Sequence, residues 1–311
     1  MPQEWLEFEQ PLAELTERID ELAAIGAKDE VKRLREEAVK LKEKIYADLT
    51  PWQRVLLARH PRRPYTLDYV DRIVTDFLEL HGDRGFADDP AIVVGLGRID
   101  GVGFAIVGHQ KGRDTKEKLA RNFAMPHPEG YRKALRMMKL AARFGLPILA
   151  LVDTPGAYPG VGAEERGQAE AIARNLREMA VLPVPIIVVV TGEGGSGGAL
   201  AISVGDRLMM QENAIYSVIT PEGCASILWR DNSKTEQAAE VMRITAAEIL
   251  KLGIIDEVIP EPLGGAHQDW DEAAALLKKA VMRAYRSLSQ EPTDRLVKRR
   301  IGRLAAIGVY A

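Results

Sequence analysis

Two glycine-rich segments, each behind a fully apolar run, constrain the fold of this chain most. Ile148–Val152 is followed at 153–162 by DTPGAYPGVG, and Ile186–Val190 is followed at 192–199 by GEGGSGGA. Apolar runs without polar alternation predict strands that are covered on both faces. Helical patterns follow both segments. The chain is therefore expected to be an α/β protein whose glycine segments lie at the carboxyl edge of the sheet, where ligands bind.

Further strands and helices are expected on both sides of these segments. Residues 91–95 and 102–108 are β-rich and are separated by Asp100-Gly101, a strong hairpin signal. The pattern then predicts a helix from Pro128 to Gly145, one helix from about Ala163 to Ala180, and helical structure again from about Trp270. Other expected strands are 208–211, 215–219 and 255–259.

The N-terminal part is expected to form a helical hairpin. Apolar residues recur at spacings of three and four from Leu12 to Leu22 and again from Val31 to Leu49, with Gly26 as a left-handed stop between them. Thr50-Pro51 is typical of a helix start. After Arg62-Arg63-Pro64, a linker, another helix is expected, with the apolar residues Tyr69, Ile73, Phe77 and Leu80 on one side.

The glycine segments are suited to binding an anion. Glycines let backbone N–H groups approach a ligand closely, and fixed donors of this kind stabilise a developing oxyanion. The alternative is that the glycines only make tight turns. A phosphate loop is disfavoured because no Gly-Lys-Ser/Thr follows, and a dinucleotide fingerprint is disfavoured because 195–198 lacks the G-x-G-x-x-G spacing.

Single side chains give weaker signals. Ser196 has no base near it in sequence, so a nucleophilic role is disfavoured. Cys224 is expected to be a small buried residue. The five histidines show no metal-ligand spacing, and no metal is expected in this chain. The segment 109–113 carries Lys111 and Arg113, which either bind a carboxylate or phosphate of the substrate or lie in a solvated loop.

Composition excludes several classes of protein. The 311 residues carry a formal charge of −3, so no overall field attracts nucleic acid. The basic run Arg295–Arg303 is expected to be a solvated helix face and not an RNA-binding patch. The single cysteine excludes an internal disulfide. No apolar run approaches the length of a membrane span, and the acidic start does not resemble a secretory leader, so a soluble cytoplasmic protein is expected.

Longer motifs resemble the carboxyltransferase α subunits of bacterial acetyl-CoA carboxylases. The resemblance runs from Phe8 to about His267. It rests on the two glycine segments, extended to Gln168 and Leu200, and on GHQKG at 108–112, RNF at 121–123, PEGYRKA at 128–134, SVITPEGCA at 217–225 and EPLGGAH at 261–267. It implies a crotonase-like superhelix of repeated ββα units. We accordingly divide the chain into the hairpin and linker at 1–65, the carboxyltransferase domain at 66–290 and a helical tail at 291–311.

The resemblance also implies an activity and an assembly. The reaction moves a carboxyl group from biotin, carried covalently on a carrier protein, to acetyl-CoA and gives malonyl-CoA for fatty acid synthesis. The implied partners are a β subunit in an α2β2 heterotetramer, the biotin carboxyl carrier protein, and a separate biotin carboxylase that uses ATP. The β subunit is expected to carry a zinc ribbon and most of the acetyl-CoA site. No membrane partner is expected.

The site residues follow from placing the family pattern on this sequence. The N–H groups of Gly198 and Ala199 are expected to bind the ureido oxygen of biotin. Gly194, Gly195 and Gly197 are expected to shape the turn, and Gly156 and Ala157 to line the opposite wall.

Two rival hypotheses about the function stay open. One is a self-sufficient hydratase or serine hydrolase, for which Glu164, Glu165, Glu193 and Glu222 are candidate acids and bases. The other is a non-catalytic scaffold.

Overall fold

The computed structural model describes residues 4–308. Residues 1–3 and 309–311 lie outside the described residues, and with them most of the acidic start and the end of the expected 291–311 tail. Eight strands within the described part form one sheet in the order β1-β2-β3-β4-β5-β6-β8, with β7 paired to β5. The strands are β1 Thr75–Glu79, β2 Ile92–Ile99, β3 Val102–His109, β4 Ile148–Thr154, β5 Ile186–Gly195, β6 Arg207–Gln211, β7 Ile215–Ser217 and β8 Glu257–Ile259.

The sheet is antiparallel at one side and parallel over the rest. β2 and β3 form the expected hairpin, in which Asp100 (φ 47°) and Gly101 (φ 80°) are both left-handed. Such a pair suits the right-handed twist of the flanking strands. From β3 onward, β4, β5, β6 and β8 run parallel to one another. Their carboxyl ends therefore meet at a single edge.

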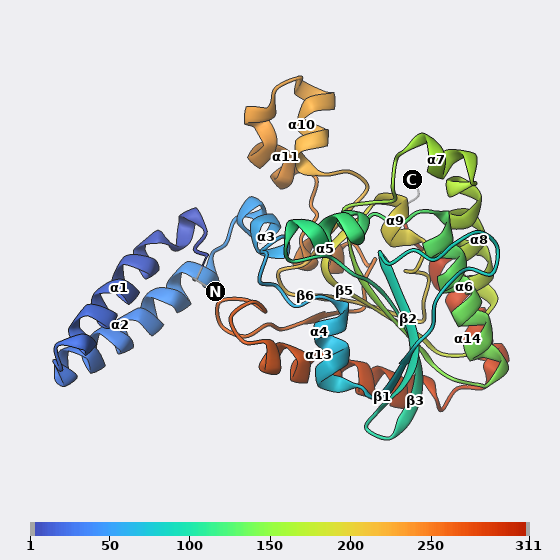
Figure 1. Ribbon diagram of the computed structural model, residues 1–311, viewed down its shortest axis with the longest axis horizontal. Coiled ribbons are helices and arrows are strands. Elements are labelled where there is room, and N and C mark those ends of the chain that lie inside the picture. Colours follow the sequence, from blue (N-terminus) through green and yellow to red (C-terminus); the bar gives the residue numbers. More distant parts are fainter. Residues whose placement is uncertain (1–3, 309–311) are drawn as a thin grey trace.

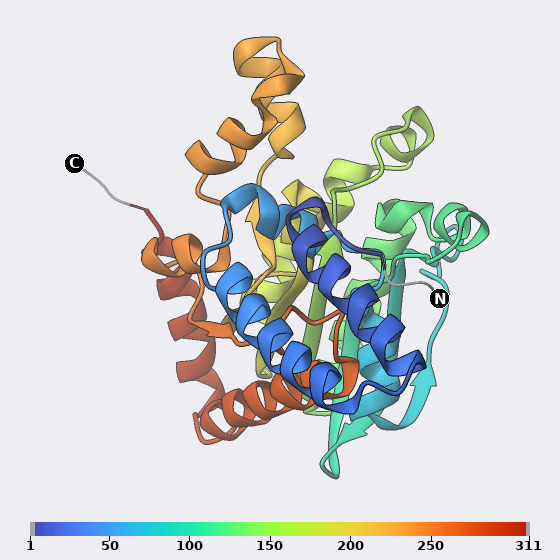
Figure 2. The ribbon, with the colours of Figure 1, turned by 90° about the vertical axis from the view of Figure 1, so that its left-hand side faces the viewer.

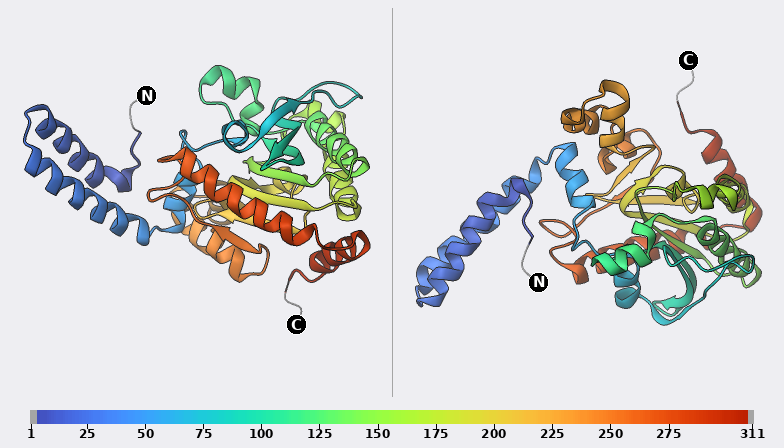
Figure 3. Two further views of the ribbon diagram at one scale, coloured as in Figure 1. Left: turned by 90° about the horizontal axis from the view of Figure 1, so that it is seen from below. Right: turned by 45° about the horizontal axis from the view of Figure 1, so that its top comes forward.

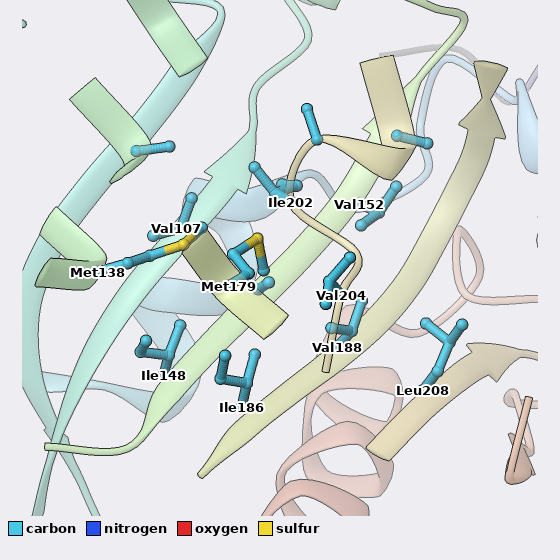
Figure 4. Close-up of a cluster of buried hydrophobic side chains, with 14 of the residues drawn as sticks. Val107, Met138, Ile148, Val152, Met179, Ile186, Val188, Ile202, Val204 and Leu208 are labelled. Atoms are coloured by element: carbon cyan, nitrogen blue, oxygen red, sulfur yellow. The ribbon is translucent and has the colours of Figure 1, made fainter. Parts of the chain in front are cut away.

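Helices cover both faces, which explains why the central strands are apolar throughout. On one face, the side chains of Ile148 and Val188 pack under α6 (Pro128–Arg143) and α8 (Gln168–Val181); Figure 4 shows this layer. On the other face, Leu149 and Val189 pack against α4 (Thr66–Ile73) and α13 (Trp270–Leu288). The remaining helices are η1 Glu7–Glu9, α1 Gln10–Ala24, α2 Lys28–Ala47, α3 Pro51–Ala58, α5 Thr115–Ala120, η2 Asn122–Ala124, α7 Val161–Glu165, α9 Ser196–Leu200, α10 Pro221–Trp229, η3 Asn232–Lys234, α11 Thr235–Val241, α12 Ala246–Lys251 and α14 Thr293–Ala305.

The N-terminal hairpin is confirmed and projects from the body of the molecule (Figures 1, 2 and 3). Gly26 has φ 79° and reverses the chain between α1 and α2. Ile19, Val31 and Leu34 are buried between the two helices. Thr50 caps α3 as expected, because its side chain accepts a hydrogen bond from the Gln53 N–H.

Two predicted helices are wrong in extent. The helix after the linker ends at Ile73, and Phe77 and Leu80 lie in or beside β1, because the β-branched residues Val74 and Thr75 extend the chain and Leu78 pairs with Leu96 of β2. The helix predicted from 163 to 180 is broken at Gly167, whose φ of 83° separates α7 from α8.

The basic run 295–303 is not simply a solvated face. Arg300 on α14 is fully buried, and its guanidinium pairs with Asp206 at 2.6 Å. The same group donates to the carbonyls of Met179, Leu182 and Val184, each at 2.8 Å. Its Nε–H also donates to the second oxygen of Asp206 at 3.0 Å, so all five donors of this arginine are used. The periodicity of the run could not distinguish this buried residue from its exposed neighbours.

Candidate functional site

The two glycine segments meet at the carboxyl edge of the sheet. The second segment is not a loop throughout: β5 continues to Gly195, where Glu193–Gly195 pair with Ile215–Ser217 of β7. Thr154, at the end of β4, pairs with Gly194. The chain then turns directly into α9 at Ser196. The sequence pattern suggested a loop because glycine is uncommon inside strands.

The glycines of the second segment allow two backbones to touch. A Cβ added at Gly195 would stand 2.2 Å from the Pro155 carbonyl oxygen. At Gly198 it would stand 2.5 Å from both the Ala157 nitrogen and the Gly156 carbonyl carbon. At Gly197, by contrast, it would meet only Ile172, at 3.7 Å. Gly195 and Gly198 are therefore required by close approach of the first segment, whereas Gly197 is not.

Hydrogen bonds hold the first segment in place. The Thr154 hydroxyl lies 2.5 Å from the Ala124 carbonyl and 2.8 Å from the Gly156 carbonyl, and it accepts from the Gly156 N–H at 3.0 Å. The Gly192 position is equally confined, because a Cβ there would stand 2.4 Å from the Asp153 carboxylate. This packing fixes the walls of the site on rigid backbone and leaves little to side-chain motion.

A network of charged side chains, most of them buried, borders the site. Lys111 contacts Asp153 at 2.7 Å and Glu193 at 3.0 Å, and Arg59 contacts Glu193 at 2.7 Å and Glu222 at 2.5 Å. Burial opposes ionisation of Glu193, but Lys111 and Arg59 outweigh it and lower its pKa. Burial likewise opposes the charge on Lys111, yet the carboxylates of Asp153 and Glu193 raise its pKa. Glu193 and Lys111 are therefore charged, and their contact locks Glu193 to the neighbouring strands, whereas burial raises the pKa of Asp153 despite its contact with Lys111.

This network bears on the hydratase hypothesis. A general acid needs a raised pKa, but Glu193 and Glu222 are paired with Arg59 and have lowered pKa values, although burial acts against the lowering in both. Glu164 and Glu165 lie exposed on α7. None of the four carboxylates is placed as a buried, protonated acid.

The two candidate cations have different surroundings. Lys111 lines a cavity of about 200 Å³ together with Tyr65, Phe123, Pro155 and Glu193. Arg113 does not line it: its guanidinium lies over the rings of Tyr65 and Trp270, 4.3 and 4.5 Å from their centres, and pairs with Asp68. Neither cation is in a solvated loop. Whether either binds substrate stays a prediction.

Ser196 and Cys224 show no sign of nucleophilic activation. Ser196 is left-handed (φ 54°), and its hydroxyl makes no hydrogen bond within residues 4–308. Cys224 is buried beside Ala225 and Ala238, as expected. His109 is fully buried, and burial lowers the pKa of its imidazole to about 3.

The left-handed conformation of one turn in the site, residues 122–124, was not predicted from the sequence. Asn122, Phe123 and Ala124 are three consecutive non-glycine residues with positive φ, at 48°, 54° and 57°. They form η2 between α5 and α6, next to the cavity that Phe123 lines. The RNF motif was visible in the sequence, but nothing in its residue types indicates a left-handed backbone.

Comparison with known proteins identifies the family. The family model described as acetyl co-enzyme A carboxylase carboxyltransferase-like matches residues 5–308. The acetyl-coenzyme A carboxylase carboxyl transferase subunit alpha of Halorhodospira halophila is 58% identical over 314 aligned residues, covering 99% of each chain. That of Thioalkalivibrio sulfidiphilus is 57% identical over 316, covering 100% of this chain and 99% of its own. The chain belongs to the family of acetyl-CoA carboxylase carboxyltransferase α subunits.

Solved structures agree on the fold of this family member. Transcarboxylase 12S with bound methylmalonyl-coenzyme A superposes with a TM-score of 0.59 at 22% identity, over 72% of this chain and 41% of that one. A Pseudomonas malonate decarboxylase hetero-tetramer in complex with coenzyme A gives 0.57 at 20% identity, over 70% and 88%. The crotonase-like fold expected from the sequence is confirmed. The class of carboxyltransferase enzyme is confirmed by the relatives that are 57–58% identical.

Proposed function

We propose that this α subunit, together with a β subunit in an α2β2 assembly, transfers the carboxyl group of carboxybiotin to acetyl-CoA. The observation that carries the proposal is the contact of Gly198 with Gly156 and Ala157, which brings two backbone walls together at the carboxyl edge of the sheet. Membership of the family along the whole chain supports the choice of reaction. Both substrates are supplied from outside this chain.

The Gly198 and Ala199 N–H groups are the proposed donors to the ureido oxygen. Gly198 is among the first three residues of α9, whose N–H groups have no acceptor within the helix. When the carboxyl group leaves the ureido nitrogen, negative charge develops on that oxygen, and fixed donors stabilise it by about 3–4 kcal/mol each. The carboxyl carbon then bonds to the acetyl methyl carbon, whose proton passes to the nitrogen that was released.

The other proposed roles are structural or belong to partners. Gly194 and Gly195 are proposed to shape the turn, and Gly197, where a Cβ has room, is not required for it. Lys111, which lines the cavity, keeps its proposed role in binding substrate, whereas Arg113 lies outside the cavity lining. The biotin is proposed to arrive on its carrier protein after an ATP-dependent carboxylase has loaded it. Zinc is proposed for the β subunit; no group of His, Cys, Asp or Glu within residues 4–308 of this chain could hold a metal ion. No helix in the same range could cross a membrane. The cytoplasmic location stays a prediction.

The proposal is tested by reconstitution. The purified chain is expected to form little malonyl-CoA alone and to gain activity with a zinc-ribbon β subunit and carboxylated carrier protein. Robust transfer by the chain alone would contradict the division of labour. Hydration of an enoyl-CoA by the chain alone would favour the hydratase hypothesis, and no activity in any combination would favour a scaffold.

A further inference from the structure

The cavity beside the two glycine segments is lined in part by residues that have no role in the reaction proposed above. Lys118 of α5 and Phe123 of η2 form part of its wall, together with Lys111, Pro155 and Glu193. Figure 1 shows α5 and α9 at the same edge of the sheet. Pro155 belongs to the first glycine segment and Glu193 to the second, so Lys118 and Phe123 share this cavity with both segments.

The backbone of this wall is strained and firmly held. Left-handed φ values at three successive non-glycine residues cost of order 1–3 kcal/mol each and persist only where the surroundings impose them. The Asn122 amide contacts Asp89 at 3.2 Å and His127 at 3.0 Å, and the Ala124 carbonyl accepts from Thr154, the residue that also fixes Gly156. The turn is thus tied directly to the first glycine segment.

The strain presents an aromatic ring to solvent. Phe123 is 47% exposed although its neighbour Ala124 is fully buried. An exposed phenylalanine on a strained turn serves no purpose in the core, which favours a role in contacting another molecule.

The second part of the wall is the ammonium group of Lys118. Arg59 and Lys111, the other cations of the cavity, are paired with Glu193, Glu222 and Asp153. Lys118 forms no ion pair within residues 4–308. Its position depends on Gly112, where a Cβ would stand 2.2 Å from the backbone nitrogen of Lys118 and from the Glu117 carbonyl carbon.

We infer that Phe123 and Lys118 are substrate-contact residues for carboxybiotin, and this inference rests on the proposed function. The carboxylated ureido group is planar and carries one negative charge, so it matches an aromatic face beside a free ammonium group. The pantetheine arm of acetyl-CoA is flexible and uncharged, and it offers neither feature. Phe123 packs on the ureido plane, and Lys118 contacts the carboxylate.

The two residues are distinguished by running the reaction in both directions with the α–β complex. Phe123→Gly should raise KM about 3- to 10-fold for carboxylated carrier protein and also for biocytin in the reverse reaction, the loss expected for one aromatic contact. Lys118→Gln should raise KM about 5- to 10-fold for the carboxylated substrate only, because biocytin has no carboxylate on its ureido nitrogen. KM for acetyl-CoA should not change.

Matched variants and stability separate these roles from general damage. Glycine accepts φ 54° without strain, so Phe123→Gly should melt at or above the wild-type temperature. Phe144→Gly removes an exposed ring elsewhere, and Lys116→Gln removes a charge from the same helix; neither should alter KM for biotin.

Three results would overturn the inference. They are an unchanged KM in Phe123→Gly, an equal effect of Lys118→Gln in both directions, and loss of α–β association in Phe123→Gly without a change in KM, which would make the ring an interface residue. Failure of the proposed function is recognised separately, since the wild-type complex would then transfer nothing.

Discussion

At the scale of single residues, two adjacent glycines of α9 have different tasks. Gly198 lies against the backbone of the first glycine segment, whereas Gly197 has room for a methyl group beside Ile172. Both are in the same five-residue helix, so replacement by alanine changes helix propensity equally. Comparing alanine at these two positions therefore isolates the effect on activity of pushing the two glycine segments apart.

Gly198→Ala is expected to lower kcat of carboxyl transfer by about 10²–10³, the usual cost of misplacing one oxyanion donor, while Gly197→Ala stays within about threefold of wild type. The measurement is kcat of the α–β complex, with the melting temperature taken on the same samples. Equal losses in the two variants, or a loss in Gly198→Ala that only follows unfolding, would place the oxyanion site elsewhere.

The position of the glycine segments in the fold could be predicted from the sequence, but the charge network and the left-handed turn beside them could not. Glycines after apolar strands are a local pattern, and their place at the carboxyl edge of the sheet was predicted correctly, whereas the contact between the two glycine segments was not predicted. Lys111, Asp153 and Glu193 are far apart in the chain, and only the parallel pairing of β3, β4 and β5 brings them together. No local pattern gives such a network, and none gives the left-handed turn at Phe123.

At the scale of elements, the predicted bounds of helices and loops were wrong where strand pairing outweighed the local sequence pattern. Phe77 and Leu80 have helical spacing with Tyr69 and Ile73, yet β2 offers an unpaired edge and draws Thr75–Glu79 into the sheet. β5 continues through glycines for the same reason, since β7 pairs with it there. The hairpin α1–α2, by contrast, has no sheet to compete with and was predicted closely.

The last helix, α14, is held to the body by the buried Arg300, by Leu296 and by Arg303, which pairs with Asp256. Arg300→Met should destabilise the protein by about 3–5 kcal/mol, because it leaves the buried Asp206 carboxylate without its partner. Arg299→Met is the control: that side chain is partly exposed and, among residues 4–308, pairs only with Glu291, so a change within about 0.5 kcal/mol is expected. Urea unfolding of both variants tests this, and similar midpoints would show that α14 is held by other contacts.

At the scale of the whole molecule, buried histidines are expected to set its response to acid. Burial lowers the pKa of His60, His109 and His267, to about 3 for His109 and about 2 for His267, where the charge of nearby His60 adds to the effect. Rings of His60 and His267 stack at 3.9 Å. Below their ordinary pKa of 6.5, the unfolded chain binds protons that the folded chain does not, so stability falls as pH falls.

The free energy of unfolding should therefore decline from about pH 6.5 downward, by up to about 1.4 kcal/mol per pH unit for each of these histidines. Urea midpoints at pH 7.5, 6.5 and 5.5 measure the slope. His267→Gln should flatten it, whereas His81→Gln, at an exposed site, should not. A midpoint that is constant between pH 7.5 and 5.5 would show that these imidazoles are not kept neutral by the fold.

The pairing of Arg300 with Asp206 has a consequence for synthesis on the ribosome. The two residues are 94 positions apart, so the strand that begins beside Asp206 emerges long before the cation that neutralises it. Until then the N–H of Ile186 is the only buried partner of this carboxylate in the part of the chain that the structure describes, and closing the core around the charge is unfavourable. We therefore expect the core around Asp206 to close only after α14 has been translated.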